Sequence, residues 1–398
     1  MSDGLSHALA EAAAALDRED PHTAQAALAP FADQLADDVR VARLWAGLLH
    51  HASSPQGIER ELARFAQAWA HDPEVMQIAA AGAVRWCRRH PLEAPARREP
   101  VARAAAECLR RAIHARKGGR GATERHALHA ALARALTLVG PAVDDDALHA
   151  WETALTLHPE DGEGWFGLAR LHTLRGRWRK GLEASQHALT LLDVPAVRWN
   201  LALCATALGE AEVAAQAWQA LEHPAHVTLE GGAVVPDLPP VEVCLTPATL
   251  GLDGQPAGGD WQVEAVWVQP LSPAHGRLVH PTRLPGPADF DDVVLWDAEP
   301  ESFRPVDGRD VPRFVALAVL RAGRAQTLPV AGWLPYPKAL MRVDAALPLG
   351  CFVHSFDPPR KGDFHGKLVF PKGLDPASAL SALEAAATIA EARIAPIR

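Results

Sequence analysis

The sequence predicts an α + β multidomain protein, in which an N-terminal α-solenoid of helical hairpins precedes a small β-rich domain with a C-terminal helix. Three observations lead to this fold class. Up to about residue 222 the chain is rich in Ala, Leu and Arg, and apolar residues recur at helical spacing. Beyond it come most of the 33 prolines and short β-type runs interrupted by Pro and Gly. Similar segments also recur about every 34 residues, the mark of a repeat architecture. We therefore expect a helical domain over 1–222, a linker over 223–240 and a β-rich domain over 241–398.

Composition excludes several classes of protein. The chain has 398 residues, of which 48% are hydrophobic and 22% charged, and this is typical of a folded protein. The formal net charge of −9 argues against a role in coating nucleic acid. No apolar run approaches the roughly 18 residues of a membrane helix, and no secretory signal is recognised at the start. The 5 cysteines are widely spaced and form no Cys-x-x-Cys pair, so we expect a reducing compartment, the cytoplasm.

The repeat is clearest between residues 122 and 221. Trp165-Phe-Gly-Leu-Ala and Trp199-Asn-Leu-Ala each lead to a glycine, Gly176 and Gly209. The upstream segment 132–159 repeats the pattern with a slightly longer turn, and 42–74 fits it again. These segments resemble the tetratricopeptide repeat, a helix–turn–helix unit of 34 residues. The units 5–36 and 76–116 depart from the pattern, because the first is mostly Ala and the other contains the segment 91–100, predicted to be an inserted loop. Six hairpins are expected.

Physical arguments support stacked hairpins. Small residues such as Ala133 and Ala169 allow paired helices to approach closely, while tryptophans such as Trp151 fill the space between hairpins. Gly140, Gly176 and Gly209 stand where the first helix of a hairpin is expected to end, a position that favours glycine. A single hairpin cannot bury its apolar face, so stacking has to supply the core.

The resemblance implies a concave groove lined by the first helix of each hairpin. Arginine binds carboxylates with two parallel hydrogen bonds, so an acidic peptide or protein is the expected partner. The alternative is that the groove arginines, Arg134 and Arg170, pair with acidic residues of neighbouring helices. Residues at the groove positions of the family are His50, Arg134, Thr137, Phe166, Arg170, Thr173, Trp199 and Asn200.

A basic stretch runs from Arg85 to Arg125 and holds twelve Lys and Arg against four Glu. Three interpretations remain open: a solvated helical face, a contact for an acidic protein, or the nucleic-acid contact of an accessory protein. Trp86 is the one aromatic residue within the stretch, whereas readers of single strands usually interleave aromatic residues with the charges.

The second half predicts a barrel or an open antiparallel sheet with one helix packed on it, possibilities that include OB-like and SH3-like barrels. An acidic group after residue 288 is expected to form a solvated sheet edge or, alternatively, to bind a cation; it comprises Asp289, Asp291, Asp292, Asp297, Glu299 and Glu301. Asp375 is expected to cap a closing helix that starts at Pro376. The predicted strands are Val241–Leu245, Trp261–Val268, Val293–Trp296, Phe314–Leu320 and Lys367–Phe370, and the predicted helix is Pro376–Ile394.

The segment 351–365 is the most enzyme-like part of the sequence. His354, Asp357, Asp363 and His365 have the ligand types of a zinc or iron site, although a Pro-Pro turn separates the two histidines. Cys351 and His354 are expected to lie on opposite faces of a strand, which disfavours a nucleophile–base pair. A polar hairpin turn is the other interpretation of this segment.

The sequence therefore predicts a non-catalytic interaction scaffold without a cofactor, which binds a protein or an acidic peptide in the groove. Nucleic acid and membrane partners are not expected. Two alternatives are a metal-dependent enzyme with its site in the C-terminal domain and a nucleic-acid accessory protein that uses residues 85–125.

Overall fold

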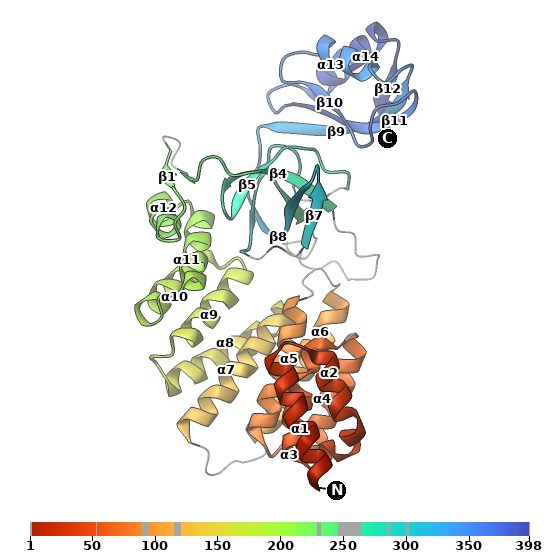
Figure 1. Ribbon diagram of the computed structural model, residues 1–398. Coiled ribbons are helices and arrows are strands. Elements are labelled where there is room, and N and C mark those ends of the chain that lie inside the picture. The colour runs from red at the N-terminus through yellow and green to blue at the C-terminus, as the bar shows by residue number, and fades with distance from the viewer. Residues whose placement is uncertain are drawn as a thin grey trace. The chain divides into compact units, whose positions relative to one another are not determined.

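Figure 1 shows the helices and strands of the computed structural model. The chain divides into two compact units, and the division falls inside one helix. The first unit extends to Leu201 and the second begins at Ala202, both in α11 (Pro195–Leu208). The predicted fold class is confirmed, since helices precede a β-rich region with a C-terminal helix. The domain limits at residues 222 and 240 stay a prediction. The structure describes residues 2–52, 54–89, 95–114, 121–228, 232–245, 264–284, 286, 288–298, 300 and 302–397.

The first unit is a succession of helical hairpins. Helices α1 and α2, α5 and α6, α7 and α8, and α9 and α10 pack as pairs. Between successive hairpins, α3 packs against α5 and α4 against α6, so that equivalent helices adjoin. The helices are α1 (Ser2–Asp17), α2 (Pro21–Leu28), α3 (Val39–Gly47), α4 (Pro55–Ala68), α5 (Pro73–Arg89), α6 (Pro95–His114), α7 (Ala122–Val139), α8 (Asp144–Leu157), α9 (Gly162–Leu174) and α10 (Trp178–Leu191), with 3₁₀ segments at Ala29–Ala36, Leu49–His51 and Pro141–Val143.

Local sequence explains where several helices begin and end. Asp20 caps α2, and Ser54 caps α4 by accepting a hydrogen bond from the Gly57 N–H at 3.1 Å, with proline at the first helical position in each case. Gly176, between α9 and α10, has a φ of 64°, a conformation that is cheap for glycine. The predicted role of glycine at this turn is confirmed.

The predicted loop over 91–100 is only partly outside the described residues, and where it is described the prediction is wrong. Helix α6 begins at Pro95 and includes Pro100. Pro100 is the sixth residue of α6, so its missing N–H removes one backbone hydrogen bond near the start of the helix.

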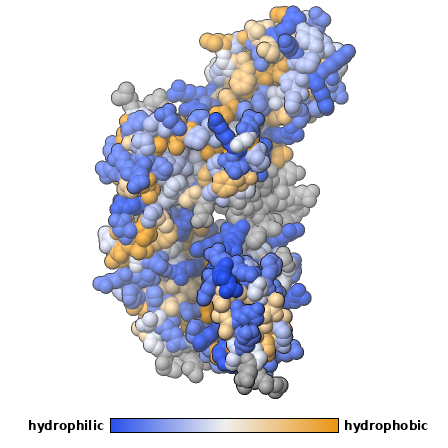
Figure 2. Space-filling model, viewed as in Figure 1, coloured by the Kyte–Doolittle hydropathy of each residue, from blue (hydrophilic) through white to orange (hydrophobic). Residues whose placement is uncertain are grey.

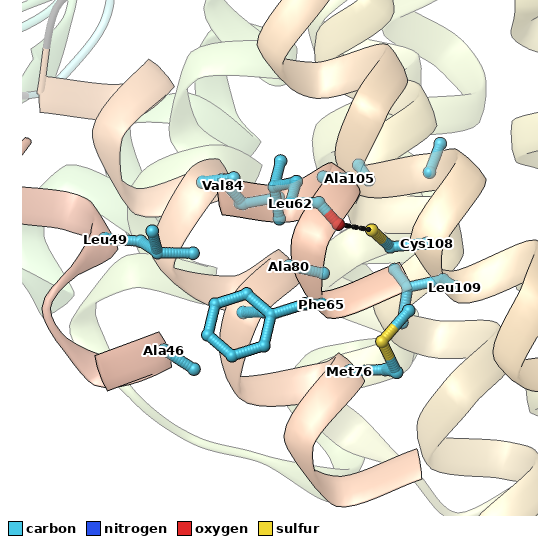
Figure 3. Packing of buried hydrophobic residues seen from close by; sticks show 14 of the residues in the cluster. Ala46, Leu49, Leu62, Phe65, Met76, Ala80, Val84, Ala105, Cys108 and Leu109 are labelled. Atoms are coloured by element: carbon cyan, nitrogen blue, oxygen red, sulfur yellow. Dashed lines mark hydrogen bonds between the residues drawn. The ribbon is translucent and has the colours of Figure 1, made fainter. Parts of the chain in front are cut away.

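Hydrogen bonds at repeat spacing show that the hairpins stack as equivalent units. The Trp69 indole N–H donates to the Leu35 carbonyl at 2.6 Å, and the Trp86 indole donates to the Ala52 carbonyl at 3.1 Å. Each bond spans 34 residues, the length of one tetratricopeptide unit. A continuous apolar core runs through these helices, and Figure 3 shows Phe65 in it among side chains from α3 to α6.

The second unit begins with the rest of α11 and α12 (Ala211–Ala220) and continues into strands. The predicted linker contains the antiparallel pair β1 and β2, and the Val235 N–H donates to the Leu271 carbonyl of β4 at 2.8 Å. The remaining elements are β1 (His226–Val227), β2 (Ala233–Val234), β3 (Val241–Leu245), β4 (Glu264–Ser272), β5 (His275–Leu278), β6 (Val293–Trp296), β7 (Ser302–Val306), β8 (Arg309–Arg321), β9 (Ala325–Leu334), α13 (Ala339–Ala346), β10 (Phe352–Ser355), β11 (Gly362–Pro371), α14 (Pro376–Ile389) and β12 (Arg393–Pro396).

Strands β3, β4, β5, β6 and β8 form a closed barrel. Neighbours along the chain are antiparallel, and the barrel closes where β3 pairs in parallel with β8, with Val243 opposite Phe314. Strand β7 pairs with β8 and extends it as a hairpin. This order is a meander, unlike the Greek-key order of an OB fold. Val243, Val268 and Trp296 belong to the buried barrel core.

A second sheet follows, which the sequence did not predict as a separate layer. Its antiparallel strand order is β10-β11-β9-β12, and its core includes Leu340 of α13, Leu383 of α14 and Phe364 of β11. Asp375 caps α14 as predicted, accepting the Ser378 N–H at 3.0 Å. The predicted end of this helix at Ile394 is wrong, because α14 stops at Ile389 and the chain turns at Glu391 (φ 57°) into β12.

Candidate functional site

The predicted groove residues lie mainly on α7, α9 and the start of α11. Along α9, Phe166, Arg170 and Thr173 are spaced by four and three residues, so they share one face of the helix. Arg134 and Thr137 share a face of α7 in the same way. Hydrophobic and hydrophilic residues are interspersed on the surface that Figure 2 shows, so hydropathy does not single out a binding surface. Whether these residues form a binding surface therefore has to be judged from the charges and hydrogen bonds of their side chains.

Arg170 is held by a buried chain of hydrogen bonds. Its Nη1 donates to Oδ1 of Asn200 at 3.2 Å, and Nδ2 of Asn200 donates to the Ser185 hydroxyl at 2.8 Å. The Ser185 hydroxyl donates in turn to the Gly181 carbonyl at 2.7 Å. Asn200 is 1% exposed. Its amide therefore lies inside the helical domain, where its hydrogen bonds join α9, α10 and α11 and position the Arg170 guanidinium.

Arg134 of α7 contacts side chains of the two helices that follow it, α8 and α9. Its guanidinium lies over the Trp151 ring at 5.6 Å and its Nη2 is 3.6 Å from Oε2 of Glu163. Glu163 is 76% exposed in its side chain, so this ion pair contributes little to stability. Arg134 thus pairs with an acidic residue of a neighbouring helix, which is the alternative that the sequence left open. Its guanidinium is still partly exposed to solvent.

The two predicted threonines are buried, with exposed fractions of 9% for Thr137 and 1% for Thr173. Their hydroxyls donate to the carbonyls of Ala133 and Ala169 in the same helix, at 2.8 and 2.9 Å. Such bonds satisfy a buried hydroxyl without any partner molecule. Phe166 and Trp199 are half-buried.

His50 lies apart from these helices in sequence, in the 3₁₀ segment after α3. Its Nδ1 is 2.8 Å from the Gly47 carbonyl, and its ring centroid is 3.8 Å from that of His51. Burial, assisted by His51 and Arg85, lowers the pKa of His50 to about 4. His50 is therefore neutral near neutral pH and offers no cation to an acidic ligand.

Three charged residues missing from the sequence predictions bind the central hairpins together. Asp144, at the start of α8, is buried and accepts from Nε of Arg175 at 2.8 Å and from Nη2 of Arg177 at 2.6 Å. Arg175 also donates to the Thr137 carbonyl at 2.7 Å. The available sequence signal is the separation of Asp144 from Arg175 and Arg177, which is 31 and 33 residues and close to one repeat.

Three arginines of the basic stretch form ion pairs within the protein. Arg103 contacts Glu99 at 2.5 Å, Arg111 contacts Glu107 at 3.0 Å, and Arg110 contacts Asp146 of α8 at 2.5 Å. These pairs support a solvated helical face for α6. The basic residues of 115–120 lie outside the described residues.

The possible metal ligands in 351–365 are not assembled into a site. Within the part of the chain that the structure describes, no three His, Cys, Asp or Glu side chains are placed to hold a metal ion. His354 instead faces His280, with ring centroids 5.0 Å apart, and Asp357 contacts Arg283 at 3.2 Å. Asp357, Asp363 and His365 do line a small cavity of about 220 Å³ in the β10–β11 hairpin.

Alternate residues of β10 and the turn after it contact the loop that follows β5 in the barrel. Phe352 packs against Phe290 at 5.2 Å, His354 against His280, and Phe356 under the Arg283 guanidinium at 5.2 Å. We call this contact between the barrel and the second sheet the β10 seam. The stretch that looked most like an enzyme site is thus used in packing.

A partly buried ion pair completes the β10 seam. Nζ of Lys367 in β11 lies 2.5 Å from Oδ2 of Asp289, which also accepts from the Thr327 hydroxyl at 2.5 Å. Lys367, Thr327 and burial act on the same carboxyl, and the pKa of Asp289 is lowered although burial alone would raise it.

Asp291 and Asp292 have internal partners as well. The Asp291 side chain pairs with Arg277 and accepts the Arg324 N–H at 2.5 Å, and Asp292 accepts the Gly323 N–H at 2.6 Å. The predicted solvated edge or cation site is therefore wrong for Asp289, Asp291 and Asp292, whose carboxylates bind other groups of the chain. Asp297 accepts the Ala298 N–H at 2.8 Å, and Glu299 and Glu301 lie outside the described residues.

Comparisons with known proteins give a partial likeness in fold. No protein-family model and no curated protein matches the sequence. Among solved structures, that of MamA has a TM-score of 0.32 at 15% identity over 42% of this chain and 87% of its own. An assembly chaperone of RpL4, Acl4, has a TM-score of 0.34 at 16% identity over 55% of this chain and 89% of its own. A tetratricopeptide repeat protein from Parabacteroides merdae has a TM-score of 0.26 at 11% identity over 55% and 93%.

TM-scores and sequence identities this low do not indicate a shared function. The predicted resemblance of the N-terminal half to tetratricopeptide repeats is confirmed, and its basis is the pairing of helices and the hydrogen bonds at a spacing of 34 residues. Among the described residues, no helix combines the length and the apolar character needed to cross a membrane.

Proposed function

We propose that the helical repeats are a scaffold that binds a protein partner through an acidic segment, on the face formed by α7, α9 and the start of α11. The observation that carries this proposal is the positioned guanidinium of Arg170, held by Asn200, whose amide is itself held by Ser185. A guanidinium fixed in this way loses less side-chain entropy when it binds a carboxylate.

Phe166 and Arg134 supply the other contacts of the proposed surface. Phe166 lies one helical turn before Arg170 on α9, and Arg134 presents a half-exposed cation on α7. An aromatic side chain beside arginines is the usual composition of an energetic centre in a protein interface. Asn200, Thr137 and Thr173 act in this proposal as internal supports.

A non-catalytic role is part of the proposal. It is supported by the packing of 352–356 in the β10 seam, where His354 faces His280 and does not line the cavity of Asp363 and His365. We place the protein in the cytoplasm, which is supported by the five cysteines, which are buried and not joined in disulfide bonds.

The test compares retention of native-organism proteins on immobilised full-length chain. We expect Arg134→Ala/Arg170→Ala to lose proteins that the wild type retains, as identified by mass spectrometry. Arg103→Ala/Arg111→Ala on α6 removes the same charge from two exposed ion pairs and is the matched control. Equal retention by both double variants, with unchanged circular dichroism, would remove this face from consideration.

A further inference from the structure

A second charged surface lies on the barrel, separate from the helical repeats. Strands β7 and β8 form a hairpin with Ser302 opposite Arg313, Arg304 opposite Val311 and Val306 opposite Arg309. Directly opposed residues of an antiparallel pair, and alternate residues of a strand, share a face. Arg304, Arg309 and Arg313 therefore lie on one face of the hairpin, which we call the arginine face.

A buried carboxylate fixes two of these arginines. Glu242 of β3 has a side chain that is 3% exposed, and its Oε2 accepts from Nε and Nη2 of Arg313 at 3.1 and 3.0 Å. Its other oxygen pairs with Nη2 of Arg304. A carboxylate is costly to bury unless it is well paired, and here the pairing holds both guanidinium groups in place.

The arginine face keeps a net positive charge. Three arginines against Glu242 leave an excess of two positive charges on the residues that form it. The side chains of Arg304 and Arg313 are 44% and 28% exposed, and Arg309 is exposed with no side-chain partner among the described residues. Each guanidinium has five N–H donors, so the bonds to Glu242 leave donors of Arg304 and Arg313 available.

The neighbouring aromatic residues favour carboxylates over nucleic-acid bases as the ligand. Trp267 of β4 is covered by the Arg304 guanidinium, which lies 5.6 Å from the ring centroid. Phe303 is 61% exposed but belongs to the opposite face of β7, opposite Pro312. Single-stranded nucleic acids bind proteins through open aromatic faces beside cations, and this surface leaves no such arrangement among its described residues.

The free edge of the hairpin is also protected against strand addition. Pro305 lies in the middle of β7, which pairs on one side with β8. Proline offers no N–H to a further strand, and an edge strand that contains it is a poor template for pairing. A ligand would therefore bind through side-chain charge rather than by extending the sheet.

We propose that the arginine face binds an acidic peptide segment of a protein partner, whose carboxylates contact Arg304, Arg309 and Arg313. The chain's own Glu242 shows the mode of contact, since Arg313 donates two hydrogen bonds to one of its oxygens. This surface is distinct from the α7–α9 face and gives the protein a second contact with a different part of its partner or with another protein.

The test uses fluorescence anisotropy at low salt with a labelled peptide of about ten glutamates. To separate this surface from the repeats, the starting protein carries Arg134→Ala/Arg170→Ala in the full-length chain. We expect Arg309→Glu to weaken binding about tenfold, the effect of losing one charge-assisted hydrogen bond. Arg360→Glu, at another exposed arginine of the same unit, is the control with an equal charge change and is expected to bind like the starting protein.

Arg309 is chosen because its replacement leaves Glu242 paired and the fold intact. A second variant, Arg304→Lys, keeps the charge and is expected to weaken binding by a smaller factor. The proposal is overturned if the starting protein fails to bind the peptide, if Arg360→Glu weakens binding as much as Arg309→Glu, or if an oligothymidylate of equal length displaces the peptide at lower concentration than unlabelled polyglutamate does.

Discussion

Asp144 and Arg175 are 31 residues apart in the sequence and are joined by a hydrogen bond of 2.8 Å between Oδ1 and Nε. Asp144 begins α8 and Arg175 follows α9, so the pair ties two neighbouring hairpins together. Arg177 adds a second bond to the same carboxylate, and Gly176 provides the turn that brings both arginines to it. One tight turn thus carries two arginines that link neighbouring repeat units through Asp144.

Replacing Asp144 by Ala is expected to destabilise the helical repeats by about 3 kcal/mol, because the mostly buried Arg175, 13% exposed in its side chain, is left without its counter-charge. Urea unfolding followed by far-UV circular dichroism measures the effect. Asp145→Ala, at the exposed next residue of α8, is the control and is expected to change little. If the two variants unfold at the same urea concentration, the carboxylate does not stabilise the stack.

The sequence predicts features that depend on nearby residues. The cap of α14 by Asp375 and the turn at Gly176 follow from side-chain chemistry within a few residues, and both are observed. The helical hairpins follow from the repeated spacing of apolar residues. These features need no knowledge of how distant segments meet.

Features that join distant segments could not be predicted in this way. Lys367 and Asp289 are 78 residues apart and meet because β10, β11 and the loop after β5 are brought together by the tertiary fold. Likewise, Asn200 stands at a predicted groove position, and its burial between helices is decided by the packing of α9 and α10 against α11. The residue types at Asp289 and Asn200 indicate hydrogen bonding or ion pairing. Which partner each side chain binds depends on how distant segments pack together.

The Lys367–Asp289 pair is expected to stabilise the β10 seam. Lys367→Met leaves Asp289 partly buried without its cation and is expected to cost about 2 kcal/mol. Asp289→Asn is expected to have a similar effect, and the double variant to lose less than the sum, because the two residues form one interaction. Lys361→Met, at an exposed residue of the same hairpin, is the control. Strict additivity in urea unfolding would contradict this coupling.

The cysteines are expected to be unreactive in the folded protein. Burial raises the pKa of Cys87 to about 11 and that of Cys108 to about 12, so almost no thiolate is present at neutral pH. A colorimetric disulfide reagent should find little thiol in the native chain and all 5 thiols after denaturation. Rapid native labelling of Cys87 or Cys108, located by peptide mapping, would show that α5 and α6 open readily.

Acid is expected to weaken the barrel through His275. This side chain is buried, its Nδ1 lies 2.6 Å from the Ser272 hydroxyl, and burial together with Arg321 lowers its pKa from 6.5 to about 4. The unfolded chain therefore binds the proton first as the pH falls, so stability rises with pH in this window. The stability that depends on neutral His275 is complete above pH 6.5 and is lost as the pH falls through about 4.

As the pH is lowered from 6.5 to about 4, we expect the urea midpoint of the wild type to decrease. The midpoint of His275→Gln is expected to be lower at pH 6.5 and to decrease less over the same range. His50 and His172, whose pKa values burial also lowers to about 4, keep part of the decline in the variant. His7→Gln, at an exposed histidine of α1, is the control and should follow the wild type. A decline in His275→Gln as steep as that of the wild type would mean that His275 is protonated equally in the folded and unfolded chains.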